Sequence, residues 1–183
     1  MEKVGAYHLL GRIYKQSHNY EEALRLFKQS IMIYDSLNHY HYTGIVRNDL
    51  GELYLSMGKL DSAQIHSQKS YELGLQYKNR KVQYYSLPTL GKIQHVKGNN
   101  SLALFYYLKG LKLDVKNYLY YNPNLAIAKI YQQIGQPDSS IFFAKQSLEI
   151  GLENGFYSSI IDASIFLSGI YEKNDLQKSL AYS

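Results

Sequence analysis

The sequence predicts an all-α fold, a superhelix (α-α solenoid) of antiparallel helix pairs with about ten helices. Three observations lead to this prediction. A motif of a small residue, two variable residues and usually a tyrosine recurs along the chain, no useful stretch alternates apolar and polar residues as a strand would, and the 183 residues include only three prolines. The small residues follow one another at spacings of 40, 40, 37 and 40: Gly11, Gly51, Gly91, Ala128 and Ser168.

Each copy of the motif is predicted to form two helices joined by a short turn. In the first copy, the motif helix is followed by the turn Ser17-His18-Asn19 and by apolar residues at helical spacing from Ala23 to Tyr34. The copies divide the chain into repeats of approximately 2–39, 40–79, 80–117, 118–156 and 157–183, of which the last is incomplete. We therefore expect one array over residues 1–183.

Capping signals mark where several helices begin. Asn19, with Glu22 three residues later, fits a capping box for the second helix, and Asn99 or Asn100 can cap the sixth helix. The order of Asn122-Pro123 suits an N-cap and a first helical residue, and Pro137 suits the first turn of the eighth helix.

Pro88 lies within the expected span of the fifth helix. Because proline lacks a backbone donor, we expect a kink or a late start of that helix. The short spacing of 37 follows, so we also expect a change of curvature in the middle of the array.

A glycine inside a helix costs about 1 kcal/mol relative to alanine, so its recurrence needs a reason. Two helices joined by a three-residue turn pack antiparallel, and close approach requires small side chains where they cross. The second helices also carry small residues at matching places: Ala23, Ala63, Ala103, Ser140 and Ser179. We therefore expect Gly51 to lie against Ala63.

The small-x-x-Tyr helix, the turn, the following alanine and a later aromatic such as Phe27 or Tyr107 resemble the tetratricopeptide repeat. The resemblance covers essentially the whole chain, with three departures. Tyr7 stands where the family has a tryptophan, the closing proline is missing, and the period is about 40 rather than 34 residues. Long-helix repeats of this kind are similar to those of kinesin light chains, polarity scaffolds and bacterial sensors or transcription regulators. The resemblance implies a scaffold that binds proteins or peptides.

In the family, the first helix of each pair lines a concave groove. Carried over to this sequence, the resemblance implies a peptide-binding groove formed by His8, Arg12, Lys15, Asn48, Glu52, Tyr85, Lys92, His95, Lys129 and Gln132. The basic members favour a peptide with acidic groups. The alternative is that these side chains form only a solvated face.

Family members that grip chaperone C-terminal peptides use a clamp of basic and asparagine side chains. The corresponding positions here are His8, Arg12, Asp49, Tyr85 and Thr89. Only Arg12 keeps the charge, and Asp49 would repel a carboxylate, so we do not expect that ligand.

No arrangement of residues predicts catalysis, a metal site or a cofactor. The chain has no cysteine, no nucleophile with a base and an orienting group, and no glycine-rich phosphate loop. His39 and His41 are two residues apart, so on a helix they point in different directions. We expect a protein that is not an enzyme.

Two other functions stay open. One is a sensory or regulatory module of a bacterial-type signalling protein or transcription regulator, whose output domain lies outside this chain. The other, which we favour least, is a nucleic-acid-binding array: the net charge is +5, and tyrosine pairs (Tyr84-Tyr85, Tyr106-Tyr107, Tyr120-Tyr121) accompany Lys109, Lys112 and Lys116.

The two ends of the sequence suggest a fragment of a longer protein. The chain starts directly in a first helix and stops about eight residues into the tenth helix, which is short for a helix on its own. The alternative is a homodimer through the open C-terminal edge. No apolar run approaches the roughly 20 residues of a membrane span, and a cytoplasmic location is favoured over a periplasmic one.

Overall fold

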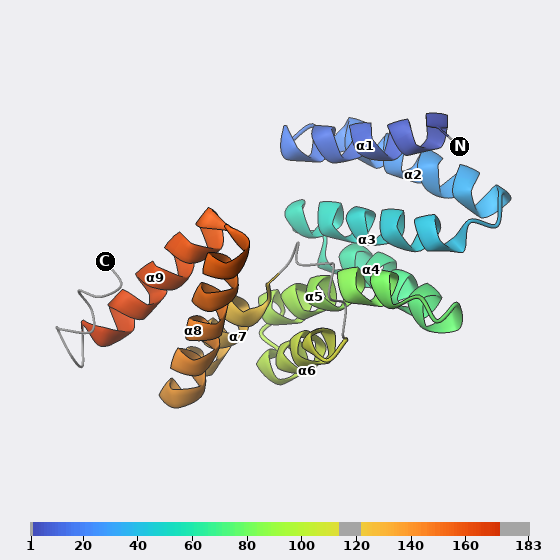
Figure 1. Cartoon of the computed structure of the whole chain (residues 1–183). Coiled ribbons are helices and arrows are strands. Elements are labelled where there is room, and N and C mark those ends of the chain that lie inside the picture. Colours follow the sequence, from blue (N-terminus) through green and yellow to red (C-terminus); the bar gives the residue numbers. More distant parts are fainter. Residues whose placement is uncertain (1, 114–121, 173–183) are drawn as a thin grey trace. The chain divides into compact units, whose positions relative to one another are not determined.

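A computed structural model describes residues 2–113 and 122–172, and every regular element in these ranges is a helix (Figure 1). The helices are α1 (Glu2–Gln16), α2 (Tyr20–Ser36), α3 (Tyr40–Ser56), α4 (Leu60–Gln76), α5 (Arg80–Val96), α6 (Asn100–Leu111), α7 (Asn124–Gln133), α8 (Pro137–Asn154) and α9 (Tyr157–Tyr171). The expected tenth helix, Ser179, Lys116 and Tyr120-Tyr121 lie outside the described residues. The all-helical prediction is confirmed for the part of the chain that is described.

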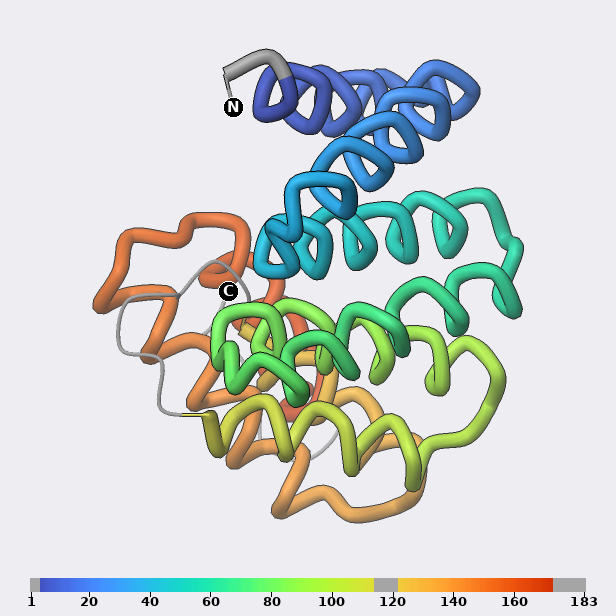
Figure 2. Tube along the Cα trace, turned by 90° about the vertical axis from the view of Figure 1, so that its right-hand side faces the viewer, coloured from blue at the N-terminus to red at the C-terminus, as the bar shows by residue number. Residues whose placement is uncertain are grey.

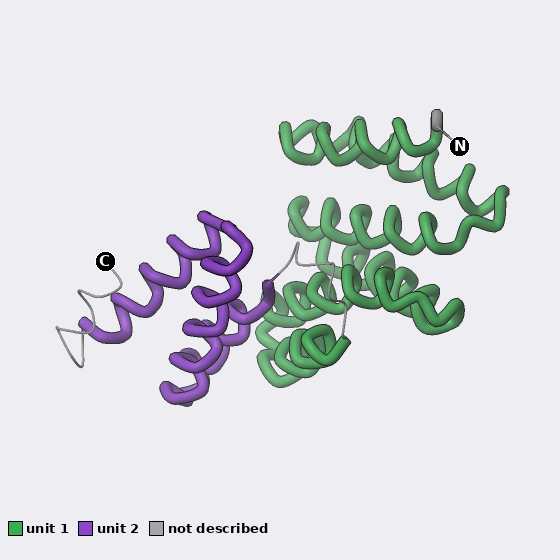
Figure 3. The backbone as a smooth tube through the Cα atoms, in the orientation of Figure 1, with its two compact units in different colours: residues 1–118 green, residues 119–183 purple. Residues whose placement is uncertain are grey.

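The chain forms two compact units, Met1–Tyr118 and Leu119–Ser183 (Figure 3). In unit 1, α1 pairs with α2, α3 with α4 and α5 with α6. Each second helix also packs on the next first helix, as α2 does on α3 and α4 on α5, and the first helices α1, α3 and α5 contact in turn (Figure 2). In unit 2, α8 packs between α7 and α9. Unit 1 therefore places its three first helices in one row.

Close helix crossings explain the glycines of the repeat motif. A Cβ added to Gly51 would meet the Oγ of Ser67 and lie 3.2 Å from the carbonyl oxygen of Ala63. The Cβ position at Gly11 is 2.6 Å from the Phe27 ring, and at Gly91 it is 2.6 Å from the Tyr107 ring. Since a side chain at these places would collide with the second helix, the predicted contact between Gly51 and Ala63 is confirmed.

Every described turn between helices contains one residue with a left-handed backbone. Glycine fills four of these places, but His18 (φ 60°), Asn38 (φ 55°) and Lys78 (φ 50°) fill the others. The left-handed residue reverses the chain after each helix and satisfies terminal carbonyls, as in an αL cap.

The predicted caps are confirmed only in part. Asn19 Oδ1 accepts a hydrogen bond from the Glu22 amide at 3.4 Å, but the Glu22 carboxylate binds Arg25 instead of completing the capping box. Asn99 occupies the N-cap position of α6 as expected, but no side chain caps the helix, because those of Asn99 and Asn100 bind Gln94 and His95 of the preceding helix.

The late start expected at Pro88 is also wrong. Helix α5 begins at Arg80, where the Asn79 side chain accepts from the Val82 amide at 3.1 Å, and it continues through Pro88 to Val96. The hydroxyls of Ser86 and Thr89, which flank the proline in the sequence, donate to the carbonyls of Val82 and Tyr85 in the preceding turn of the helix.

The prediction for Pro137 is confirmed, and Asn122 makes the expected capping bond although α7 begins one residue later than predicted, at Asn124. Asn122 Oδ1 accepts from the Asn124 amide at 3.0 Å across Pro123, whose backbone is helical, and Pro137 opens α8. These are positions where proline's missing N–H costs nothing.

Candidate functional site

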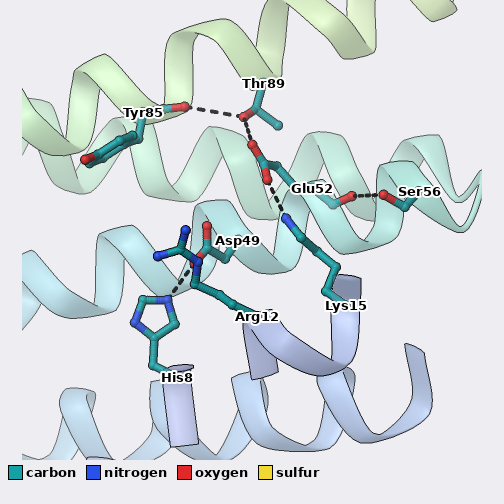
Figure 4. A network of polar contacts seen from close by, with 8 residues as sticks. All are labelled: His8, Arg12, Lys15, Asp49, Glu52, Ser56, Tyr85 and Thr89. Atoms are coloured by element: carbon teal, nitrogen blue, oxygen red, sulfur yellow. Dashed lines mark hydrogen bonds and ion pairs between the residues drawn. The ribbon is translucent and has the colours of Figure 1, made fainter. Parts of the chain in front are cut away.

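The row of first helices in unit 1 brings together polar side chains that are far apart in the sequence. We call this surface the first-helix face; it consists of His8, Arg12, Lys15, Asp49, Glu52, Tyr85, Thr89 and Lys92 (Figure 4 shows all but Lys92). Residues of α1, α3 and α5 meet there because these helices contact in turn. Rigid helices thus hold the whole set.

One group of contacts joins α1 to α3 around Asp49. The ring Nε2 of His8 lies 2.6 Å from Asp49 Oδ2, and the Nε of Arg12 lies 4.0 Å from the same oxygen. The Asp49 side chain is 16% exposed, whereas that of Arg12 is 58% exposed. Asp49 is therefore held within the helix row, and Arg12 presents a cation to the solvent.

A second group of contacts joins all three helices through Glu52. Lys15 Nζ donates to Glu52 Oε2 at 2.6 Å, and the Thr89 hydroxyl lies 3.5 Å from Glu52 Oε1 (Figure 4). Burial lowers the pKa of the Lys92 ammonium, while the neighbouring Glu52 raises it and Lys15 lowers it further. The carboxylate of Glu52 thus pairs with Lys15 of α1 and lies close enough to Lys92 of α5 to affect its pKa.

Three of the predicted groove residues, including Tyr85 of the first-helix face, are placed less favourably for a ligand. Asn48 is 3% exposed, because it lies one turn after Gly44, whose Cβ position contacts Val82 of α5. His95 Nδ1 is 3.0 Å from Asn100 Oδ1 at the α5–α6 turn. Tyr85 is half-buried on α5, and its carbonyl accepts from Thr89.

Lys129 and Gln132 lie on α7 of unit 2, where both are exposed. They belong to a different unit from the other eight predicted residues. The first-helix face as defined above therefore ends with α5.

Two members of the first-helix face, Asp49 and Thr89, were not among the predicted groove residues. Both occupy positions of the family's peptide clamp, but their residue types argued against that clamp. The spacing could have indicated that these residues lie on the same surface. Asp49 and Glu52 are one turn apart on α3, and Lys15 precedes Glu52 by 37 residues, which is nearly one repeat.

The two tyrosine pairs considered for nucleic-acid binding that lie within the described residues, Tyr84-Tyr85 and Tyr106-Tyr107, do not form exposed platforms. Tyr107 is 1% exposed, and Tyr84, Tyr85 and Tyr106 are half-buried. The ammonium of Lys109 lies over the rings of Tyr71 and Phe105 at 5.2 Å and 5.3 Å, so it is occupied within the protein.

Within residues 2–113 and 122–172, no group of three or more His, Cys, Asp or Glu side chains has an arrangement that could hold a metal ion. His39 and His41 instead pack edge-on against the Tyr42 ring. None of the described helices combines the length and hydrophobicity that a bilayer span requires.

Comparison with known proteins identifies the repeat. The family model for the tetratricopeptide repeat matches residues 4–76. A Tonsoku-like protein of Drosophila melanogaster is 29% identical over 176 residues, which cover 91% of this chain and 12% of the relative. The chain thus spans about an eighth of the length of that relative.

Two solved structures share the fold over nearly the whole chain. A signal transduction ATPase with numerous domains and a tetratricopeptide repeat sensor, from Pyrococcus horikoshii, matches 99% of this chain and 28% of its own, with a TM-score of 0.82 and 19% identity. Aspartyl phosphate phosphatase F from Bacillus subtilis matches 99% of this chain and 58% of its own, with a TM-score of 0.76 and 15% identity. At these identities the likeness shows the fold alone.

The repeated helix pairs, the small residues at their crossings and the match of the family model lead to the same assignment. Residues 4–76 match the family model of the tetratricopeptide repeat, and the described helices of the chain follow the helix-pair fold of the similar solved structures.

Proposed function

We propose that the first-helix face of unit 1 binds a peptide or an extended segment of a partner protein. The observation that carries the proposal is the row of α1, α3 and α5, which holds cationic, anionic and hydroxyl side chains on one rigid surface (Figure 4). Groups fixed on helices lose little conformational entropy when a ligand binds. A tetratricopeptide repeat generally serves as a protein-interaction module, and this arrangement is suited to that role.

The charges of the face favour a ligand with acidic groups. Arg12, Lys15 and Lys92 contribute three positive charges, against two negative charges from Asp49 and Glu52. Lys15 is already paired with Glu52. We therefore expect a ligand carboxylate to form its strongest ion pair with Arg12, which is the most exposed cation of the set and can form a bidentate pair.

The first test measures binding to a defined peptide. Proteins captured by the tagged chain from its source cells are mapped to a binding segment, and the segment is synthesised and titrated by fluorescence anisotropy. We expect Arg12→Glu to weaken binding at least tenfold, since it replaces an attraction with a repulsion. Lys28→Glu is the matched control, because Lys28 is exposed on the second helix α2. Equal losses for both variants would contradict the assignment.

Lys129→Glu tests the part of the predicted groove that lies in unit 2. If the peptide binds only the first-helix face of unit 1, this variant keeps the wild-type affinity. Loss of binding in Lys129→Glu with full binding in Arg12→Glu would move the site to unit 2.

A second candidate function is a sensory module of a larger signalling protein. Its support is the likeness to the Pyrococcus horikoshii protein, whose repeat array is described as a sensor and of which this chain spans 28%. The test is to express the chain with its natural flanking sequence and to measure the output activity with and without the mapped peptide. A change in output that Arg12→Glu abolishes supports this function, and an output independent of the peptide contradicts it.

A further inference from the structure

We propose that a second surface of unit 1, at the α2–α3 and α4–α5 turns, binds single-stranded nucleic acid through base stacking and phosphate contacts. We call it the aromatic–basic edge; it consists of Tyr40, His41, Tyr42, Tyr77, Lys78 and Arg80. Both turns lie at the same end of the helix pairs, away from the α1–α2 and α3–α4 turns (Figure 1).

Ring stacking and a hydrogen bond join the two turns. The rings of Tyr40 and Tyr77 are stacked, with centroids 4.5 Å apart and planes inclined by 7°. Beside them, the Asn79 amide donates to His41 Nδ1 at 2.6 Å. This contact holds the two turns in register, so the edge is formed before any ligand arrives.

A second stack extends the aromatic surface. Tyr42 stacks on Tyr34 with centroids 5.1 Å apart, and the His41 ring lies edge-on to Tyr42. Tyr42 remains 41% exposed and Tyr77 remains 44% exposed. Each therefore has one face packed within the protein and retains aromatic surface toward the solvent, as a stacking platform requires.

Two basic residues of the edge follow Tyr77 closely in the chain. Lys78 and Arg80 are exposed, and neither forms an ion pair with another residue that the structure describes. Residues 73–87 contain Lys78, Arg80 and Lys81 and no acidic residue. The acid that precedes the first turn, Asp35, is occupied by Arg47 and Thr43. The edge thus carries an uncompensated positive charge beside its aromatic rings.

Lys78 occupies an unfavourable backbone position. Its φ is +50°, in the left-handed region that glycine or asparagine adopts more easily, and asparagine is present at the equivalent Asn38. The charge at this turn is thus carried by a residue whose backbone conformation costs more than that of glycine or asparagine would.

The combination of parallel rings and cations favours single-stranded nucleic acid over an acidic peptide. Bases offer flat faces to Tyr42 and Tyr77 while their phosphates reach Lys78 and Arg80. The carboxylates of an acidic peptide would use the cations but not the rings, and a duplex would hide the base faces. This surface is distinct from the first-helix face.

The test uses the whole chain and a fluorescein-labelled oligouridine of about 12 nucleotides, a length within the usual range of single-strand sites. Anisotropy titrations at several salt concentrations give the affinity and its salt dependence. We expect Tyr77→Ala to weaken binding fivefold or more, and Tyr77→Phe to retain it. We expect Lys78→Ser with Arg80→Ser to reduce the slope of log K against log salt by about 1.4, from roughly 0.7 per phosphate contact.

Matched controls lie away from the edge. Lys59→Ser removes an exposed cation from the α3–α4 turn, and Tyr157→Ala removes an exposed tyrosine from unit 2. Both variants, and Arg12→Glu on the first-helix face, should bind the oligonucleotide as the wild type does, which separates this proposal from the proposed peptide site. Melting curves establish that each variant is folded.

Several outcomes would overturn the proposal. One is an absence of oligonucleotide binding by the wild type at low salt. Another is full binding by Tyr77→Ala, with polyglutamate displacing the oligonucleotide, since this would assign the edge to acidic peptides. A third is a salt slope unchanged in the Lys78→Ser, Arg80→Ser variant.

Discussion

Helices α1 and α3 carry leucine at the same place, directly before the motif glycine, yet their environments differ. Leu50 of α3 is 1% exposed, whereas Leu10 of α1 is 43% exposed. Three residues later, Leu53 is fully buried and Ile13 is 50% exposed. In α3 these positions pack into a core with Phe27 of α2.

The difference shows that a neighbouring helix, rather than residue type, buries these positions. Helices α3, α5 and α9 each follow a second helix that packs on them, namely α2, α4 and α8. Their equivalent residues are almost fully buried: Leu50 and Leu53, Leu90 and Ile93, and Leu167 and Ile170, at 0–8% exposure. Within the described residues, no second helix precedes α1 and packs on it in this way.

The largest effect expected from this comparison is on stability. Leu50→Ala should lower the free energy of unfolding by about 2–5 kcal/mol, because it leaves a cavity between α2 and α3. Leu10→Ala should cost less than about 1 kcal/mol, because the side chain is largely solvated. Urea unfolding of the two variants measures both values. Similar losses would mean that α1 is covered by another molecule or segment under the assay conditions.

A second comparison contrasts two helical glycines. Gly51→Ala should destabilise the fold by about 1–3 kcal/mol, since its Cβ would collide with Ser67. Gly5→Ala should instead stabilise it by about 0.5–1 kcal/mol, because no atom lies within 4 Å of its Cβ position and alanine favours a helix. Thermal unfolding shows whether each change raises or lowers the melting temperature. Stabilisation by both changes would refute the role of Gly51 in close packing.

The contact between α1 and α3 can be tested with Lys15 and Glu52. A double-mutant cycle of Lys15→Met and Glu52→Gln should give a coupling energy of about 0.5–1 kcal/mol, as the side chains are 20% and 34% exposed. The coupling should fall as salt is added. A cycle of Lys97 and Asp61, whose carboxylate is 95% exposed, serves as the solvated comparison and should give a smaller coupling.

The smallest effect concerns pH. Burial, followed by Arg47, Lys69 and Lys28, lowers the pKa of His66 in the folded protein below its ordinary value near 6.5. The unfolded chain therefore takes up the proton first as pH falls, so stability decreases below about pH 6.5. Burial also lowers the pKa of His41, which acts in the same direction. Between about pH 7.5 and 5.5, the urea midpoint of His66→Gln should therefore fall less than that of the wild-type protein. An unchanged fall would remove His66 as a contributor.

Local patterns predicted much of the fold. The recurring Gly11 and Gly51, the turns and the apolar spacing identified helix pairs, because helix periodicity and close crossings leave direct marks on neighbouring residues. The late start expected at Pro88 was wrong because a proline rule considers one helix alone. In the folded protein, α5 is packed against α3, α4 and α6, and these contacts hold it in one piece.

The candidate site was predicted only in outline. The sequence placed Arg12, Lys15 and Glu52 on first helices, but the spacing of nearly one repeat between Lys15 and Glu52 was not used to predict that the two side chains form an ion pair. Asn48 was assigned to the groove and is buried in the structure. Predicting which way a residue faces requires the position of the neighbouring helix, which no single helix specifies.

The sequence by itself thus determined the helices, their pairing and the repeat, since each depends on residues close together in the chain. Only the tertiary structure decided which side chains meet across helices, why Leu50 is buried while Leu10 is exposed, and how two turns 40 residues apart form one aromatic–basic edge. The physical reason is that burial and charge pairing depend on the offset between stacked helices, and that offset results from the packing of the whole unit.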